Sequence, residues 1–582
     1  MSPRRASSRR PSSFSVLAFV AAFGSTFTLS PNANAGDLAA NLRTVAVTGQ
    51  SPQLLSGGGF AAFGDRPVID DLGRVAFLAA AAADASGYSS VWVESDLGLR
   101  LIAGAGTSAP GTGGQFQMFA DLVATGEGVV AFKALLQGGA INAGTRESIW
   151  LDDSGALNLI AQAGGHAPHP SADLRFERFE TPIALNGDGQ ASFFSRTRDK
   201  ENEAVHGSGL WIADKGGSTA AASAGGPALS NDVQVAFSAQ SFEAPFGADA
   251  VVNAAGATLF RGFVEGAGVD EANSMGLWSY GASAGLQLLV RAGDKVPDAS
   301  GHRFVSFPGI PTINSAGDTA FLAFTSGGRQ GDRGAAIGVA EDMSLGVFVR
   351  IAAGDVSRVL ALGDAAPGIG GDVHLIDLFD PIMNGSRGIA VLAAVWGVGV
   401  GAFNETGLWS NAMSSDGGLR LVARQGDAAP GGDSGFVFGV FLEPSLNARG
   451  QTAFMASGYK RPGDSIVDSA FGIWGQDRNG VLRQVVRVGQ EIELASNDVK
   501  TIAALSFTSE TGNEDGKPRG LNDSGQLVFR ATFVDGSSGI FVSNVLAIPE
   551  PDTLVIACVG LFACGCMSVV AADGRRTGRA RR

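Results

Sequence analysis

One short pattern, Asn-x-x-Gly-x-x-Ala-Phe, recurs along most of this chain and constrains its fold more than any other feature. Clear copies read LNGDGQASF, INSAGDTAF, LNARGQTAF and LNDSGQLVF. Eight copies, some weaker, end at Phe77, Phe132, Phe193, Phe260, Phe321, Val391 or Leu392, Phe454 and Phe529. They follow one another at intervals of about 55 to 75 residues. A period of this size, rich in strand patterns, indicates a solenoid or a propeller.

Each repeat carries further landmarks in a constant order. About 15 to 20 residues after the Phe comes a strand pattern with a central Trp, at Trp92, Trp150, Trp211, Trp278, Trp409 and Trp474. An alternating strand pattern and a short Phe-rich segment follow, separated by turns of Gly, Asp and Pro. Four short strands per unit predict an all-β fold, a β-propeller of about eight (seven to eight) four-stranded blades. The blade count depends on whether Phe260 or the rival copy SNDVQVAF, ending at Phe237, is the true repeat.

The residue types of the motif predict one turn followed by one strand. Asn at the first position caps its own backbone in a type I turn, and Gly at the fourth takes positive φ. The Phe then fills the space between blades. The predicted structural residues are Gly73, Phe77, Phe132, Asn186, Gly189, Phe193, Asn314, Gly317, Phe321, Asn447, Gly450, Phe454, Asn522, Gly525 and Phe529. The fixed place of the Trp series in each unit favours core packing over stacking on sugars.

The two ends of the repeat body, residues 36–545, each hold part of a unit. The segment after the last motif stops after about two strands, and two more strand patterns precede the first motif. We therefore expect the strands within about Leu42 to Phe63 to pair with those within about Leu527 to Val542 in one blade. Such pairing removes two exposed sheet edges.

Charge and cysteine content exclude several functions. The whole chain has a formal charge of −14, and residues 1–35 and 573–582 each contribute +4, which leaves −22 for the residues between. A body this acidic repels phosphate backbones, so nucleic acid is not expected as a partner. Cys558, Cys564 and Cys566 are the only cysteines and lie in the C-terminal apolar run. The body therefore has no disulfide, Cys-based zinc site or Cys nucleophile.

Residues 1–35 have the three parts of a secretory signal peptide. Four Arg precede an apolar stretch from about Phe14 to Leu29, and small residues at Ala33 and Ala35 fit cleavage by signal peptidase. The alternative is an uncleaved membrane anchor, which the Gly, Ser and Thr within the apolar run disfavour.

The C-terminal residues 546–582 resemble a PEP-CTERM sorting signal. Pro549, Glu550 and Pro551 precede an apolar run at 553–572, long enough for a transmembrane helix, and an Arg-rich tail at 573–582. The resemblance implies an exosortase as processing enzyme, a basic tail in the cytoplasm, and transfer of the body to the cell surface or extracellular matrix. An ordinary C-terminal anchor is the alternative. The body, from about Asn41 to Ser543, resembles the NxxGxxAF tandem-repeat proteins with interchangeable anchors.

The search for catalytic or metal-binding residues finds only weak candidates. The sequence GASAG around Ser283 matches Gly-x-Ser-x-Gly, but it lies between two predicted strands rather than before a helix. His166 and His169 could share a metal, without an evident third ligand. The acidic loops Asn513–Pro518, Leu151–Gly155 and Asp70–Gly73 could hold Ca²⁺. No other cofactor is expected.

These observations favour an exported, non-catalytic binding or structural protein with extracellular polysaccharide as a conceivable partner. The alternative is an extracellular polysaccharide-active hydrolase or lyase on a propeller scaffold. An enzyme would need acidic, His or Tyr side chains converging at one end of the channel, and the chain has five His and three Tyr.

Overall fold

The computed structural model consists of strands and turns, without an α-helix among the described residues. The structure describes residues 41–51, 58–81, 87–169, 173–180, 182–199, 206–230, 233–235, 250–297, 301–326, 343–432, 434–460, 467–495, 498–511 and 514–547. Within these residues, no helix is long and apolar enough to cross a membrane. The predicted signal peptide, the segment 553–572, and Ala33, Ala35 and Pro549–Pro551 lie outside them.

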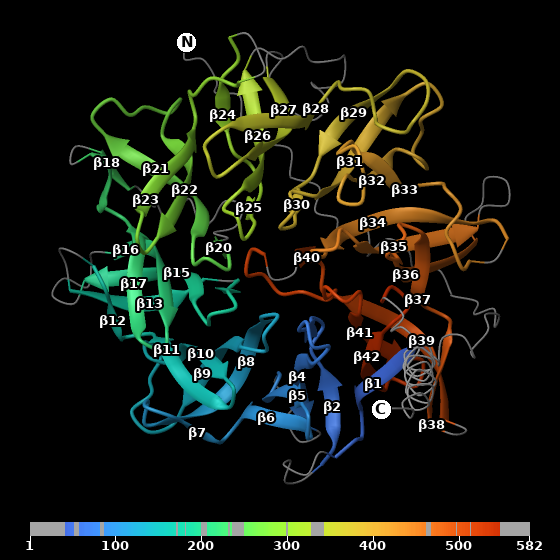
Figure 1. Cartoon of the computed structure of the whole chain (residues 1–582). Helices are drawn as coiled ribbons and strands as arrows, with labels where there is room; N and C mark the ends of the chain where they lie inside the picture. Colours follow the sequence, from blue (N-terminus) through green and yellow to red (C-terminus); the bar gives the residue numbers. More distant parts are fainter. Residues whose placement is uncertain are drawn as a thin grey trace, which may run out of the picture.

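Eight sheets, antiparallel except where β40 pairs with β34, form a closed ring in sequence order, so the predicted β-propeller of about eight blades is confirmed (Figure 1). Within a blade, a short inner strand is followed by the motif strand, the Trp strand and the outer strand, each paired with the next. The inner strand of several blades is divided into two pieces that pair with the same motif strand. The piece next to the motif turn lies closest to the centre of the ring, as β20, β25 and β30 show (Figure 1).

The first four blades are built as follows. Blade 1 contains β2 (Phe60–Phe63), β3 (Val68–Ile69), β4 (Val75–Ala81), β5 (Ser90–Ser95) and β6 (Gly98–Gly104). Blade 2 contains β7 (Ser108–Ala109), β8 (Gly114–Ala124), β9 (Val130–Gln137), β10 (Glu147–Asp153) and β11 (Ala156–Gln162). Blade 3 contains β12 (His166–Ala167), β13 (Leu174–Phe179), β14 (Ala184–Leu185), β15 (Ala191–Asp199), β16 (His206–Asp214) and β17 (Gly217–Ser223). Blade 4 contains β18 (Pro227–Ser230), β19 (Val233–Val235), β20 (Val251–Val252), β21 (Thr258–Gly266), β22 (Met275–Gly281) and β23 (Gly285–Arg291).

The other four blades repeat this plan. Blade 5 contains β24 (Phe304–Ser306), β25 (Thr312–Ile313), β26 (Thr319–Ser326), β27 (Met343–Arg350) and β28 (Val356–Ala361). Blade 6 contains β29 (Val373–Leu378), β30 (Ile382–Met383), β31 (Ile389–Gly397), β32 (Thr406–Ser410) and β33 (Arg420–Arg424). Blade 7 contains β34 (Phe436–Leu446), β35 (Thr452–Lys460), β36 (Val467–Gln476) and β37 (Leu482–Arg487), joined by β40 (Glu510–Thr511). Blade 8 contains β38 (Glu491–Ala495), β39 (Asp498–Phe507), β41 (Leu527–Phe533), β42 (Ser538–Ser543) and β1 (Leu42–Val47).

The ring closes where the N-terminal strand joins the last blade. β1 pairs antiparallel with β42 and is the outer strand of blade 8, as the incomplete units at both ends predict. The prediction was wrong for the second N-terminal strand, because β2 pairs with the motif strand β4 of blade 1. The sequence FAAF is the Phe-rich segment that precedes the first motif. In each blade this segment pairs with the motif strand that follows it, and β2 does the same.

The core lies between neighbouring blades and is built on the motif Phe. In every blade the last motif residue stands opposite an aromatic residue of the next strand, six times a Trp, as in the pairs Phe77–Trp92 and Phe454–Trp474. All six of these Trp are at most 3% exposed. Phe454 and Trp474 share one apolar cluster with Leu408 of blade 6. This burial, about 25 cal/mol per Å² of apolar surface, holds each blade to its neighbour.

Candidate functional site

The eight motif turns gather around the axis of the ring with one common geometry. In each turn the N–H of the fourth residue donates to the carbonyl oxygen of the first, at 2.9 to 3.1 Å. The side-chain oxygen of the first residue accepts the N–H of the fifth residue, as Asn186 does from Gln190 at 2.9 Å. The fourth residue has positive φ in all eight turns, with Arg387 in place of Gly in blade 6. This is a type I turn followed by a residue in the left-handed region.

The motif Asn has a second contact, which links the blades. The Nδ2 group of each Asn donates to the carbonyl oxygen of the equivalent residue in the next blade. This relay runs through Asn186, Asn253, Asn314, Asn384, Asn447 and Asn522 and ends at the carbonyl of Asp70, with distances of 2.9 to 3.4 Å. All of these Asn are at most 1% exposed. The relay therefore joins blades 3 to 8 and blade 1 through buried bonds.

Sequence reasoning missed the relay because an Asn that caps its own turn already has a local explanation. The signal was present in the choice of residue. Asp and Ser cap such turns as well as Asn does. Unlike the Asp carboxylate, the Asn amide also carries an N–H donor, and it reaches farther from the backbone than the Ser hydroxyl does.

The loop between β39 and β41 of blade 8 crosses the axis and bonds to the inner edges of distant blades. We call residues 514–520 the axial segment. The carbonyl oxygen of Gly516 accepts the N–H of Leu185 in blade 3 at 2.8 Å. The carbonyl oxygen of Asp515 accepts the N–H of Val252 in blade 4 at 2.9 Å. Figure 1 shows this part of the chain reaching the centre of the ring. The segment thus satisfies edge N–H groups that would otherwise face the channel.

Charged side chains of the axial segment are also bound internally. Asp515 is buried and accepts the Thr312 hydroxyl at 3.0 Å, while Glu514 accepts the backbone N–H of Ser315 at 3.0 Å. Arg519 is fully buried, and its Nε donates to the carbonyl of Ile69 in blade 1 at 2.8 Å. Asp515 belongs to the acidic loop that the sequence offered as a Ca²⁺ site. Among the described residues, no group of three or more His, Cys, Asp or Glu could hold a metal ion.

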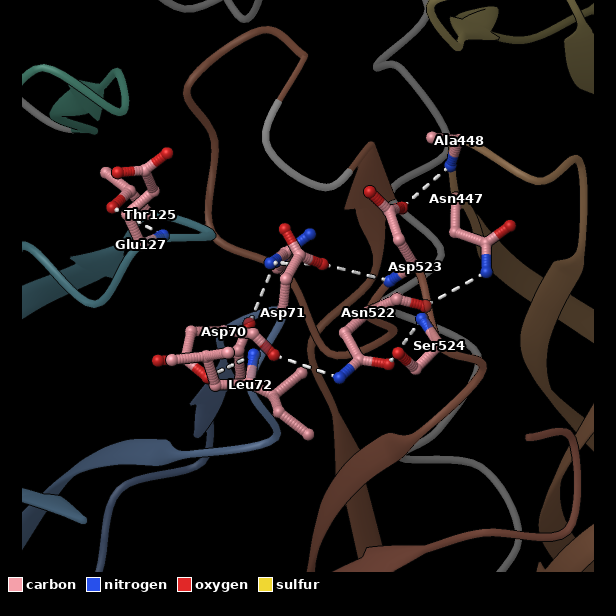
Figure 2. A network of polar contacts seen from close by, with 12 residues as sticks. Asp70, Asp71, Leu72, Thr125, Glu127, Asn447, Ala448, Asn522, Asp523 and Ser524 are labelled. Atoms are coloured by element: carbon pink, nitrogen blue, oxygen red, sulfur yellow. Dashed lines mark hydrogen bonds and ion pairs between the residues drawn. The ribbon is translucent and has the colours of Figure 1, made fainter. Parts of the chain in front are cut away.

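A polar network joins blades 7, 8 and 1 at the axis (Figure 2). The backbone N–H of Asp523 donates to the carboxylate of Asp71 at 3.1 Å, and the Asp523 carboxylate accepts the N–H of Ala448 at 2.9 Å. The guanidinium of Arg519 lies 2.8 Å from Asp71. Burial, together with the negative charge of Asp71, raises the pKa of Asp523. The network holds the seam between the last blade and the first.

Residues 69–555 match the model of a family of unknown function, DUF7453. The chain belongs to this family. No curated protein matches it in sequence. Among solved structures, it is similar to dipeptidyl peptidase 4 of Porphyromonas gingivalis, with 9% identity and a TM-score of 0.38, covering 84% of this chain and 58% of that one.

Two further solved structures are similar over nearly all of their own length. The β-propeller domain of the trilobed protease from Pyrococcus furiosus has 10% identity and a TM-score of 0.32, over 73% of this chain and 98% of the domain. The periplasmic gluconolactonase of Pseudomonas aeruginosa has 15% identity and a TM-score of 0.28, over 74% and 98%. The chain spans only 58% of the dipeptidyl peptidase. These likenesses concern the fold alone.

The structure does not bring the weak catalytic candidates of the sequence together. Ser283 lies exposed in the turn between β22 and β23, where a hairpin replaces the strand and helix of a nucleophile elbow. His166 is exposed on β12, and burial lowers the pKa of the nearby His169. In the two other acidic loops, Asp152 forms an ion pair with Arg100 at 2.5 Å, and Asp70 pairs with Arg74 at 2.6 Å.

Asp121 is a residue with unusual chemistry that the sequence analysis missed. It lies in an irregularity of β8 with a φ of 48°, which is strained for a residue other than Gly. Burial raises the pKa of its carboxyl group, although Lys133 lies 3.8 Å away. Strain and a raised pKa depend on tertiary placement and leave no pattern in the sequence.

Proposed function

We propose that the protein is exported and acts at the cell surface or in the extracellular matrix as a non-catalytic binding or structural propeller. The observation that carries this proposal is the occupation of the axis by the chain itself. The axial segment bonds to blades 1, 3, 4 and 5, and the motif Asn side chains bond to one another's backbone. Side chains engaged in this way serve the scaffold, which leaves the outer surface for partners.

Export and sorting rest on the two ends of the chain. The three-part leader at residues 1–35 and the order of Pro549–Pro551, apolar run and Arg-rich tail support cleavage by signal peptidase and then by an exosortase-type enzyme. A membrane-anchored intermediate with a cytoplasmic basic tail would precede release to the surface or matrix.

Mass spectrometry of the exported protein tests this proposal. We expect the mature chain to begin at Gly36 and to lack residues 575–582. Replacing Glu550 with Ala should leave the protein in the membrane fraction, whereas the matched control Glu271→Ala, an exposed body position, should be processed normally. Exported protein that retains the Arg-rich tail, or normal processing of Glu550→Ala, would contradict the sorting step.

A polysaccharide-active enzyme is a second candidate, and the strained, partly desolvated carboxyl group of Asp121 favours it. A carboxyl group whose burial raises its pKa is a candidate general acid. Incubation of the wild type and Asp121→Asn with neutral and acidic polysaccharides, followed by a reducing-end assay, tests it. Chain cleavage that Asp121→Asn abolishes would favour the enzyme over the non-catalytic proposal.

A further inference from the structure

The seventh Trp of the chain departs from the other six. Trp396, at the end of β31, is 44% exposed, whereas the six Trp of the repeat pattern are almost fully buried. Val398 and Phe403, in the loop that follows, are 79% and 38% exposed. A partner that covers these side chains would gain the free energy of burying the apolar surface that is still exposed. Three large apolar side chains within eight residues therefore form a surface patch that calls for a partner.

The patch lies on the side of blade 6 that faces blade 7. Side chains alternate along β31, so Trp396 points to the same side as Leu392, which packs against the apolar cluster of blade 7. Phe403 reaches the same junction, since its ring lies 6.3 Å from that of Tyr459 on β35 in an edge-on arrangement. Trp396 and Phe403 thus both lie at the junction of blades 6 and 7.

A polar pair stands beside the exposed indole. His374 on β29 is the direct cross-strand partner of Trp396, so the two side chains share a face. One imidazole nitrogen of His374 contacts the Asp372 carboxylate at 2.7 Å and the other contacts the Gly363 carbonyl at 3.0 Å, which fixes the ring. The Asp372 side chain is 81% exposed and offers hydrogen-bond acceptors at the edge of the patch. The N–H of Val398 donates to the Asp372 carbonyl at 3.3 Å, which ties the pair to the loop.

We propose that this surface, Trp396, Phe403, His374 and Asp372, binds pyranose rings of a neutral polysaccharide. An indole face accepts the apolar C–H face of a sugar ring, and a carboxylate beside it accepts hydroxyl hydrogens. The charge of −22 on residues 36–572 disfavours a polyanion. The patch is also small beside the roughly 800 Å² per partner of a stable protein interface. The inference rests on the proposed extracellular role and gives it a place and a ligand class.

The fluorescence of Trp396 provides the assay, because the other six Trp are buried from a soluble quencher. Acrylamide quenching of the purified protein is measured with laminarihexaose or cellohexaose, both neutral, and with hexagalacturonate, which is anionic. We expect a neutral hexasaccharide to protect the exposed Trp from quenching in a saturable way. Phe403→Ala and Asp372→Asn, which retain the reporter, should weaken binding by about tenfold.

Leu97→Ala is the matched control, since Leu97 is a fully exposed apolar residue in the turn between β5 and β6. It should bind like the wild type, and Trp396→Ala should lose retardation in a polysaccharide-containing native gel. No protection by either neutral hexasaccharide, equal binding of the anionic one, or protection that depends only on protein concentration would overturn the inference. If the protein is exported normally but does not bind a neutral hexasaccharide, the proposed location stands and the sugar-binding inference falls. If the protein binds the sugar but is not exported, the proposed location falls and the sugar-binding surface stands.

Discussion

Replacing Asn253 with Ala removes one link of the buried relay. The Asn253 side chain makes two contacts: its Nδ2 donates to the carbonyl of Asn314 in the next blade at 2.9 Å, and its Oδ1 accepts the N–H of Ala257 at 2.8 Å. Asn253 is 1% exposed. Water therefore cannot easily replace the lost partners.

The expected cost follows from these two bonds. Each hydrogen bond contributes about 1 kcal/mol net, and an N–H left without a partner costs about 1–3 kcal/mol. The Asn314 carbonyl retains the turn bond from Gly317, so the larger part of the loss falls on the N–H of Ala257. We expect Asn253→Ala to lower the free energy of unfolding by about 2–4 kcal/mol.

Two further variants separate the local bond from the one between blades. Asn253→Asp keeps an acceptor for Ala257 but has no donor for Asn314, and it sets a carboxylate against a carbonyl oxygen. It should destabilise the protein at least as much as Ala. Asn158→Ala is the control, because the Asn158 side chain is only partly buried and makes a single bond, to the carbonyl of Ala156. Guanidinium denaturation followed by Trp fluorescence measures all three. The reasoning fails if Asn253→Asp unfolds at the wild-type midpoint, or if Asn253→Ala matches Asn158→Ala within about 0.5 kcal/mol.

Three other predictions concern the turns and the ring closure. Gly189→Ala should lower the free energy of unfolding by about 1 kcal/mol, because φ is 77° at this position. The control Gly187→Ala in the same turn should have no effect, since nothing lies within 4 Å of the added Cβ. Equal denaturation midpoints of the two variants would contradict this. Burial raises the pKa of Asp318, but hydrogen bonds from Arg387 and two other groups outweigh it, so the pKa lies below its usual 3.8. A depressed pKa stabilises the fold above the unfolded value and ceases to do so as pH falls through the folded value. Arg387→Gln, which leaves a non-Gly residue at this positive φ, should therefore destabilise the protein at pH 7 and less at pH 3, and a loss independent of pH would refute the ion pair. Deleting residues 41–48 removes β1 and exposes the edge of β42, so thermal melts should shift to clearly lower temperature and the protein should associate; an unchanged, monomeric melt would contradict the closure.

The local part of the fold could be predicted from the sequence, and the parts that depend on contacts between distant residues could not. The turn at Asn186–Gly189 follows from four adjacent residues, whose types restrict the backbone. The bond from Asn186 to Asn253 requires knowledge that equivalent turns stack around an axis. The axial segment at 514–520 bonds to blades 3 and 4, and the period of the repeat gives no signal for contacts between such distant blades. The placement of β2 did have a local signal that the prediction misread, because the Phe-rich segment Phe60–Phe63 pairs with the motif strand that follows it.

The relay is interrupted at blade 1 and blade 2, and this interruption gives a last test. Asp70 has no side-chain donor, and Thr125 accepts the N–H of Val129 at 3.2 Å without a described bond to blade 3. Other contacts bridge these blades: the N–H of Asp71 donates to the Gly126 carbonyl at 3.0 Å, and Lys133 donates to the Phe179 carbonyl at 2.7 Å.

If the amide donor is what links the turns, then Thr125→Asn should extend the relay to the carbonyl of Asn186. Asn keeps an acceptor for the N–H of Val129, and its amide N–H reaches farther than the Thr hydroxyl, with one further heavy atom. We expect a gain of about 1 kcal/mol in the free energy of unfolding. Thr125→Asp introduces a side chain of the same shape as Asn but without a donor, so it should give no gain in the free energy of unfolding. Guanidinium denaturation of both variants decides the matter. A gain shared equally by the two would show that the turn alone, rather than the bond between blades, explains the preference for Asn.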